Sequence, residues 1–192
     1  MGTYVDAPVS GGVPGADRGD LSFLLGAAQG KGEENVQDRI KTTALYMGSQ
    51  SKLFYCGGLG FGLAAKICNN YLSCTILLAT AEAMATGIKL GIDKHLLHQV
   101  IQNSTGQSFM ADHVCPVPGV VPDAPSSHGY RLGFKAQMLQ KDVGLGVDAA
   151  NSVGIEPSIG AAALEVYKKV ALDERCIDKD ASVVYRFLGG PE

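Results

Sequence analysis

The spacing of hydrophobic positions changes about one third of the way along the chain. Up to Gly62, short apolar runs end at glycine, proline or small polar residues, which is typical of β-strands. These runs lie at Thr3–Asp6, Leu21–Leu25 and Lys52–Cys56. A helix is predicted between the second and third runs, over Glu33–Met47.

After Gly62 the pattern predicts helices alone. Leu63–Leu90 is apolar on most faces, which is expected of a helix enclosed by other helices. Helix-start and helix-stop residues then predict four more helices, over Asp93–Gln102, Phe134–Gly154, Pro157–Leu172 and Lys179–Leu188. The connection Asn103–Gly133 carries four prolines and interrupts the pattern, and ordered loops of such length are commonly functional.

The two parts predict a mainly α protein with two domains, residues 1–62 and residues 63–192. A three-stranded sheet by itself leaves its edges unpaired and one face uncovered. We therefore expect the first part to be the tail of a larger sheet domain and the second part to be a helical bundle.

Composition narrows the classes of partner that the chain is expected to bind. The chain has 192 residues, 46% of them hydrophobic, which allows a substantial core. A net charge of −3 without a Lys/Arg cluster argues against nucleic acid and favours a small-molecule or protein partner. The longest uncharged apolar stretch, Ile67–Ala81, is shorter than the roughly 20 residues that cross a bilayer, so no membrane span is expected.

Cysteine and histidine positions predict neither disulfides nor a metal site. The five cysteines are scattered, odd in number and without a CxxC pair. His95 and His98 are three residues apart on a predicted helix, but no third ligand is placed near them. We therefore expect surface histidines and no metal.

The most informative polar residues are Lys66, Asn69 and Asn70, near the start of the long apolar helix. Their i, i+3, i+4 spacing places one amine and two amides on the same helical face. An apolar surrounding disfavours the charged ammonium and prepares the amine to exchange a proton with an alcohol, whose hydroxyl Asn70 would orient. The alternative is a partly exposed helical turn in which the lysine stem reaches solvent.

A second candidate is the Ser10-Gly11-Gly12 turn, which follows a predicted strand. Glycines allow consecutive backbone N–H groups to face an anion such as a carboxylate. An ordinary glycine turn explains the same residues.

A third candidate is the set Phe134, Lys141 and Asp142, whose i, i+7, i+8 spacing would share one helical face. The alternative is a solvated charge pair beside a core phenylalanine. The nearby motif Gly60-x-Gly62-x-x-Ala65 resembles a dinucleotide fingerprint, but no second strand with a ribose-binding acid follows it. We interpret these glycines as the hinge between the sheet and the bundle.

These candidates resemble the β-hydroxyacid dehydrogenases in order and separation. The similarity is carried by Asp6–Gly12, Gly62–Asn70, Phe134, Lys141 and Asp142, with Pro116–Ser127 and Asp180–Leu188 resembling the hydroxyisobutyrate branch. The resemblance implies a Rossmann domain followed by a helical catalytic and oligomerisation domain. It therefore predicts a helical C-terminal dehydrogenase domain after the last strands of a truncated Rossmann-type α/β domain, without the glycine loop that cradles pyrophosphate.

The resemblance also implies a role for each candidate residue. By the resemblance, Ser10, Gly11 and Gly12 bind the substrate carboxylate, and Lys66 is the catalytic residue with help from Asn70. Asn69, Phe134 and Asp142 bind the substrate, and Lys141 binds the cofactor.

The activity implied is oxidation of 3-hydroxyisobutyrate to methylmalonate semialdehyde in valine degradation, with NAD or, in its place, NADP. A homo-oligomer, dimer or tetramer, is expected, in mitochondria if the source is eukaryotic and in the cytoplasm otherwise. The fragment alone is expected to be inactive. Two alternatives stay open: a tartronate or succinic semialdehyde reductase, and a noncatalytic oligomerisation module.

Two segments depart from the family pattern. Gln107 stands where the family often carries an arginine, which affects the contact with the anionic substrate. The stretch Ala27–Glu34 is rich in glycine and charge and is expected to form a flexible loop.

Overall fold

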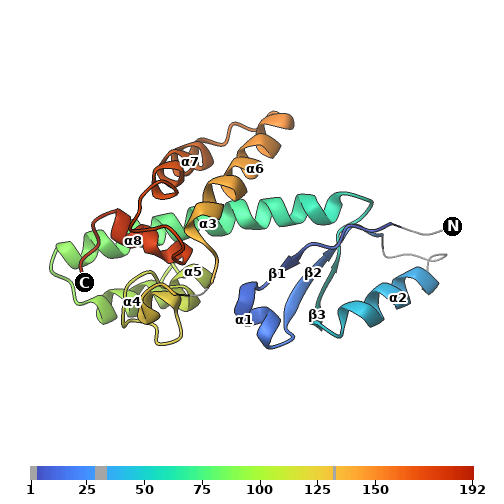
Figure 1. Cartoon of the computed structure of the whole chain (residues 1–192), viewed down its shortest axis with the longest axis horizontal. Helices are drawn as coiled ribbons and strands as arrows, with labels where there is room; N and C mark the ends of the chain where they lie inside the picture. Colours follow the sequence, from blue (N-terminus) through green and yellow to red (C-terminus); the bar gives the residue numbers. More distant parts are fainter. Residues whose placement is uncertain (1–3, 29–33, 132) are drawn as a thin grey trace. The chain divides into compact units, whose positions relative to one another are not determined.

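The computed structural model describes residues 4–28, 34–131 and 133–192 (Figure 1). The protein is mainly α-helical with a small three-stranded sheet, as predicted. It divides into two compact units, Met1–Asn69 and Asn70–Glu192. The predicted domain boundary after Gly62 stays a prediction.

The first unit is built on a mixed sheet with the strand order β1-β2-β3. Its strands are β1 (Val9–Ser10), β2 (Leu21–Leu25) and β3 (Gly48–Tyr55), with β1 antiparallel and β3 parallel to β2. Helix α1 (Gly12–Asp17) follows β1, and α2 (Glu34–Ala44) makes the crossover from β2 to β3. Phe23, Leu25 and Ala44 form the buried core of this unit.

The first strand was predicted in the wrong place. Thr3 lies outside the described residues, and the chain from residue 4 to residue 8 has no regular structure before β1 begins at Val9. Backbone hydrogen bonds from Leu24 to Pro8 (2.9 Å) and from Gly26 to Asp6 (2.7 Å) nevertheless continue the β1–β2 register through this segment. Pro8 has no backbone N–H to donate to the sheet, and the segment also approaches the start of α3. Regular strand geometry therefore begins only at Val9.

The other predictions for this unit agree more closely with the structure. The second strand and the following helix are confirmed, and β3 begins four residues earlier than predicted, at Gly48. The flexible loop expected over Ala27–Glu34 falls largely on residues 29–33, outside the described residues.

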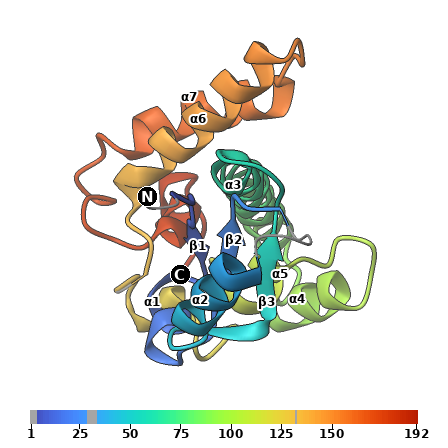
Figure 2. The same cartoon turned by 90° about the vertical axis from the view of Figure 1, so that its right-hand side faces the viewer.

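The long helix α3 (Phe61–Lys89) begins in the first unit and continues into the second. The remaining helices are α4 (Lys94–Gln102), α5 (Phe109–His113), α6 (Leu139–Ser152), α7 (Ser158–Val170) and α8 (Val184–Phe187). Short 3-10 turns lie at Pro125–His128, Ala136–Met138 and Ala181–Val183. Helices α6 and α7 run side by side as a pair (Figure 2).

The helical predictions are confirmed where local signals set the ends. Asp93 caps α4 by accepting the backbone N–H groups of His95 and Leu96, each at 3.0 Å. Gly154, with a φ of +79°, follows the end of α6, and Pro157 precedes α7. The core of this unit joins α3 residues such as Leu77 and Met84 to buried residues of α6, α7 and α8.

Three predictions for the helical part are wrong. Phe134 precedes α6, which starts at Leu139 after a 3-10 turn, so Phe134 does not share a helical face with Asp142. The connection from residue 103 to residue 133 contains α5 and a 3-10 turn. His98 is buried, and its Nε2 lies 2.9 Å from the carbonyl oxygen of Ala111, because the ring fills the contact between α4 and α5.

By length and composition alone, α3 could cross a membrane, and it is the one such helix among the residues that the structure describes. The uncharged stretch Ile67–Ala81 covers only part of this helix, which extends beyond it at both ends and includes charged residues there. A core helix of a soluble protein meets the same test, and 44% of the most apolar window of α3 is buried inside the protein.

The start of α3 is capped by a residue distant in sequence, Asp6. This side chain is 5% exposed, and its carboxylate accepts the backbone N–H of Gly60 at 2.7 Å and of Leu63 at 2.8 Å. The hydrogen bond from Gly60 is the main cause that lowers the pKa of the Asp6 carboxyl. The N–H groups at a helix start have no partner within the helix, so Asp6 supplies the acceptor that α3 lacks.

Close packing around this carboxylate explains two glycines. A Cβ at Gly26 would overlap Asp6, and a Cβ at Gly62 would overlap the carbonyl oxygen of Leu24. Strand β2 and the first turn of α3 therefore approach each other at backbone distance, with the Asp6 carboxylate between them.

We predict that Asp6→Asn destabilises the protein at neutral pH, because an amide must turn its NH2 group toward one of the two N–H donors. Since the folded pKa of Asp6 lies below its unfolded value, the stabilisation is present above the unfolded pKa and is lost as pH falls through the folded pKa. Thermal unfolding followed by circular dichroism should show the difference between wild type and variant narrowing below about pH 4.

The exposed carboxylate of Asp38 in α2 provides the control, and Asp38→Asn should change stability little at any pH. An Asp6→Asn deficit that stays constant from pH 7 to pH 3 would contradict the cap.

Candidate functional site

The Ser10-Gly11-Gly12 turn connects β1 to α1. Ser10 pairs with Ser22 in the sheet, and Gly11 and Gly12 have φ values of 136° and 61°, which favour glycine. A Cβ at Gly11 would also lie 3.1 Å from Leu21 Cδ2. Both glycines are exposed, so the backbone of this turn is accessible to a ligand at the start of α1.

The lysine and asparagine group lies in the second and third turns of α3. Lys66 and Asn70 are half-buried, whereas Asn69 is exposed. All three residues lie within α3, so their i, i+3, i+4 spacing places them on one side of the helix. Lys66 is therefore neither fully enclosed nor fully solvated.

Asn70 is held by Asp142, a contact between residues 72 positions apart. The Nδ2 atom of Asn70 donates to Oδ2 of Asp142 at 2.7 Å, and the Nζ atom of Lys141 lies 3.4 Å from Oδ1 of the same carboxylate. Asp142 is 8% exposed, whereas the Lys141 side chain is 59% exposed. A carboxylate only accepts, so the NH2 group of Asn70 must face Asp142, and the amide oxygen faces away from it as an acceptor.

The neighbouring residue Tyr71 fixes α3 against the α6–α7 pair. Its hydroxyl accepts the backbone N–H of Gly160 in α7 at 3.0 Å. A Cβ at Gly146 in α6 or at Gly160 would overlap the tyrosine ring. The ring thus occupies space that only glycine leaves, and this contact sets the distance at which Asn70 meets Asp142.

The structure therefore joins Asn70, Lys141 and Asp142 by direct contacts and places Phe134 elsewhere in the same unit. Phe134 is 41% exposed and lies in the segment that leads into α6. Gln107 donates from its side-chain amide to the carboxylate of Asp112. Among the described residues no group of three His, Cys, Asp or Glu side chains could hold a metal ion.

Sequence reasoning missed the long-range contacts of Asp6 and Tyr71. Asp6 lies in the same sequence motif as the Ser10-Gly11-Gly12 turn, but its carboxylate caps α3. The glycines that face Tyr71 were a usable signal, since a glycine inside a helix costs about 0.5–1 kcal/mol and commonly marks a close approach. Their partner could not be read from spacing alone.

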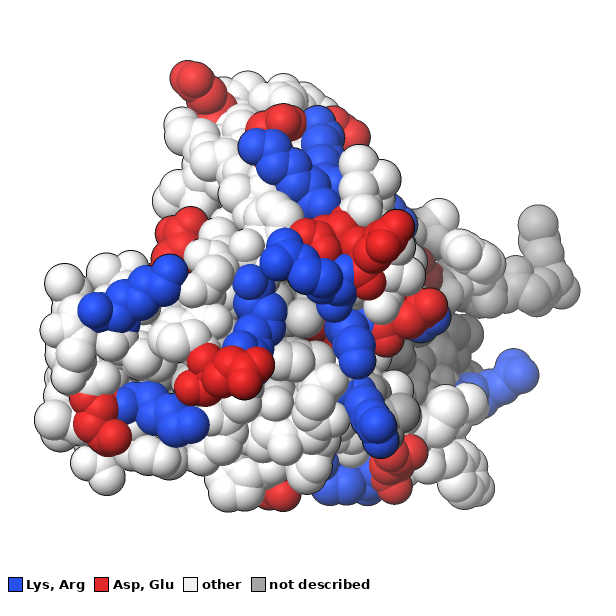
Figure 3. All heavy atoms as spheres, turned by 60° about the vertical axis from the view of Figure 1, so that its left-hand side comes forward, with Lys and Arg blue, Asp and Glu red and all other residues white. Residues whose placement is uncertain are grey.

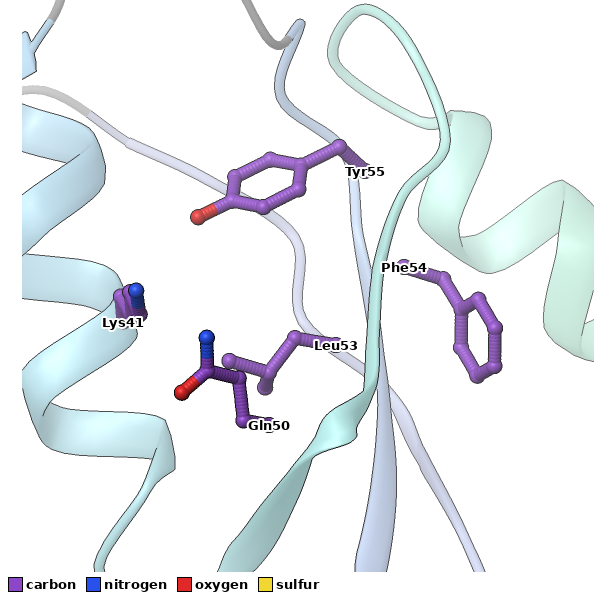
Figure 4. Close-up of a pocket in the computed structure, with 5 residues that line it drawn as sticks. All are labelled: Lys41, Gln50, Leu53, Phe54 and Tyr55. Carbon is purple, nitrogen blue, oxygen red and sulfur yellow. The ribbon is translucent and has the colours of Figure 1, made fainter.

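A pocket of about 350 Å³ lies in the first unit, between α2 and β3. It is lined by Lys41, Gln50, Leu53, Phe54 and Tyr55. Figure 4 shows Lys41, Gln50, Leu53 and Tyr55 on the α2 side of the strand, whereas the Phe54 ring points to the opposite side. None of the candidate residues predicted from the sequence lines this pocket.

Two family models match the chain. Residues 60–188 match the family model described as NAD-binding of NADP-dependent 3-hydroxyisobutyrate dehydrogenase. Residues 2–57 match the model described as the NAD binding domain of 6-phosphogluconate dehydrogenase. The chain belongs to the β-hydroxyacid dehydrogenase family.

Relatives of this β-hydroxyacid dehydrogenase chain come from distant organisms. It is 39% identical to the mitochondrial 3-hydroxyisobutyrate dehydrogenase of Pongo abelii over 96% of the chain and 53% of that protein. It is 40% identical to the probable mitochondrial enzyme of Arabidopsis thaliana, over 98% of the chain and 52% of that protein. The chain thus spans about half the length of the curated relatives it matches.

A solved structure agrees with this membership. The 3-hydroxyisobutyrate dehydrogenase of Mycobacterium tuberculosis, solved with L-serine, superposes with a TM-score of 0.83 at 37% identity. The match covers 96% of this chain and 60% of the other.

The N-terminus of α3 does not fit a pyrophosphate in this member of the β-hydroxyacid dehydrogenase family. The N–H groups of Gly60 and Leu63 already donate to Asp6, and Gly62 is packed against Leu24. An anion there would have to displace the capping carboxylate. The Lys141 side chain is exposed, and its ammonium lies beside the Asp142 carboxylate.

The surface around the helical unit carries mixed charge. Figure 3 shows Lys and Arg side chains interspersed with Asp and Glu on the face that it displays. Ion pairs at Lys135–Asp178 (2.6 Å), Lys168–Glu165 (2.7 Å) and Arg175–Asp173 (2.6 Å) belong to this unit. Exposed pairs of this kind contribute little to stability.

We predict opposite effects for two glycines in α6. Gly146→Ala should destabilise the protein by about 1–3 kcal/mol, because the new methyl group overlaps the Tyr71 ring. Gly144→Ala should stabilise it by about 0.5–1 kcal/mol, because its Cβ would meet Leu164 at 3.9 Å, an ordinary contact, and alanine favours the helix.

Urea unfolding of both variants measures these effects. Equal changes at Gly144 and Gly146 would contradict a specific contact between Tyr71 and α6.

Proposed function

We propose that this chain is the C-terminal portion of an NAD(P)-dependent 3-hydroxyisobutyrate dehydrogenase, which oxidises 3-hydroxyisobutyrate to methylmalonate semialdehyde. Relatives with that name, 39% and 40% identical over nearly the whole chain, support the proposal. The observation that carries it is the Asn70–Asp142 hydrogen bond at 2.7 Å, one helical turn after Lys66. In this proposal β1–β3 are the last strands of a truncated Rossmann-type domain.

In the proposed reaction Lys66 is the general acid and base. Its neutral amine accepts the hydroxyl proton of the substrate while the carbon that bears the hydroxyl becomes a carbonyl. The amide oxygen of Asn70 accepts a hydrogen bond from the same hydroxyl and orients it, because Asp142 holds the NH2 group on the other side. When bound, the nicotinamide of NAD or NADP supplies the hydride acceptor.

The remaining residues bind and shape the substrate in this proposal. The Ser10-Gly11-Gly12 turn binds the substrate carboxylate at the start of α1. Asn69 and Phe134 line the substrate end, Asp142 does so through Asn70, and Lys141 contacts the cofactor with its exposed ammonium.

The substrate, assembly and location are parts of the same proposal. Tartronate and succinic semialdehydes are the competing substrates for the reverse reaction, since each carries one carboxylate and one aldehyde, as methylmalonate semialdehyde does. Eukaryotic relatives are named mitochondrial, which favours mitochondria if the source is eukaryotic. A homo-oligomer, dimer or tetramer, completes the proposal.

The full-length protein that contains this chain should oxidise 3-hydroxyisobutyrate with NAD or NADP, and Lys66→Ala should lower kcat by about 10²–10⁴-fold or more. The dissociation constant of the cofactor should stay nearly unchanged, because the amine acts on the substrate hydroxyl. Steady-state kinetics and calorimetry measure the two effects.

Lys89→Ala is the matched control, since Lys89 is exposed at the other end of the same helix. Retained turnover in Lys66→Ala would refute the role of the lysine. Faster turnover of tartronate or succinic semialdehyde by the wild type would reassign the substrate.

A further inference from the structure

The segment around Asp180 binds the backbone on both sides of Phe134. Asp180 is 5% exposed, and its Oδ2 atom accepts the backbone N–H of Phe134 at 3.0 Å across 46 residues. The backbone N–H of Ala181 donates to the carbonyl oxygen of Phe134 at 2.7 Å. Both polar groups of the Phe134 backbone are therefore held by one short stretch of chain.

The Asp180 carboxylate is itself fixed. Its Oδ1 atom accepts the backbone N–H of Ser182 at 2.9 Å and the Ser182 hydroxyl at 2.6 Å. Burial raises the pKa of Asp180, and the hydrogen bonds from Ser182 and Phe134 oppose that effect. A Cβ at Gly133 would overlap the carboxylate, so the chain before Phe134 can pass only as glycine.

The surrounding backbone continues this contact. Lys135 and Asp180 form an antiparallel bridge, and Asp180 donates its N–H to the carbonyl oxygen of Tyr130 at 2.8 Å. Ala136, which is fully buried, donates to the carbonyl oxygen of Lys179 at 2.9 Å. Phe134, a residue that is 41% exposed, thus lies on a backbone segment fixed by several hydrogen bonds.

Because its backbone is fixed on both sides and its side chain is partly exposed, Phe134 presents its ring at a defined place on the surface, where a ligand can contact it. We propose that Asp180 is a positioning residue, which acts through the backbone of Phe134 to fix the ring against the substrate. This inference rests on the proposed function, in which Phe134 lines the substrate end. It gives a role to the Asp180–Leu188 motif that the catalytic residues leave unexplained.

Asp180→Asn tests the assignment in the full-length enzyme. The amide must turn its NH2 group toward Phe134 or Ser182, so one of the donors loses its acceptor. KM for 3-hydroxyisobutyrate should rise about tenfold with kcat within about threefold, because a positioned ring contributes to binding rather than to proton transfer. Gly133→Ala, which displaces the carboxylate without removing it, should have the same effect.

A double-mutant cycle separates this role from general stabilisation. In a Phe134→Ala background, Asp180→Asn should change KM less than twofold, because the ring through which it acts is gone. Ser182→Ala is the matched control: it removes one hydrogen bond from Asp180 but leaves the Phe134 contact, and KM should stay within about twofold of wild type. An equal KM increase in both backgrounds, or in Ser182→Ala, would overturn the assignment.

A second measurement needs no turnover. The 192-residue chain contains no tryptophan, so Phe134→Trp introduces a single fluorescent reporter. Its fluorescence anisotropy should fall when Asp180→Asn is added and stay unchanged when Ser182→Ala is added. Unchanged anisotropy with Asp180→Asn would overturn the proposal directly. A wild-type enzyme without dehydrogenase activity would overturn the proposed function, and with it the substrate role of Asp180, even where the anisotropy shows a fixed ring.

Discussion

The contact between the Asp6 carboxylate and the start of α3 is the constraint on which the arrangement of the first unit depends. It joins the segment that precedes the Ser10-Gly11-Gly12 turn to the helix that carries Lys66, across 54 and 57 residues of chain. A buried carboxylate with two backbone donors fixes both position and direction, because each oxygen has its own partner. The Ser10-Gly11-Gly12 turn and Lys66 are therefore attached to one fixed point.

Close approach to a glycine backbone recurs at the contacts that fix particular side chains in this structure. Gly26 and Gly62 admit the Asp6 carboxylate, Gly146 and Gly160 admit the Tyr71 ring, and Gly133 admits Asp180. In each case a polar or aromatic side chain occupies the space of a missing Cβ. The same device that packs the protein thus also orients Asn70 through Asp142 and Phe134 through Asp180, which links the fold to the proposed chemistry.

Local signals in the sequence predicted most of the helices, because a cap such as Asp93 or a stop such as Gly154 acts within one turn. The helical environment of Lys66 and Asn70 was equally predictable, since it follows from spacing. The position of Phe134 was not, because a 3-10 turn separates it from α6 and periodicity carries no sign of that break. Asp6, Tyr71 and Asp180 act on partners 46 to 89 residues away, which no local pattern encodes.

Amide hydrogen exchange at Gly60 and Leu63, measured by NMR on the wild-type chain, tests the central contact most directly. Both amides precede the region where helical hydrogen bonding protects the backbone, so their protection can come only from the Asp6 carboxylate. The account predicts that both exchange far more slowly than an unstructured chain. Exchange of either amide at the unstructured rate would contradict the cap and the attachment of the Ser10-Gly11-Gly12 turn to α3.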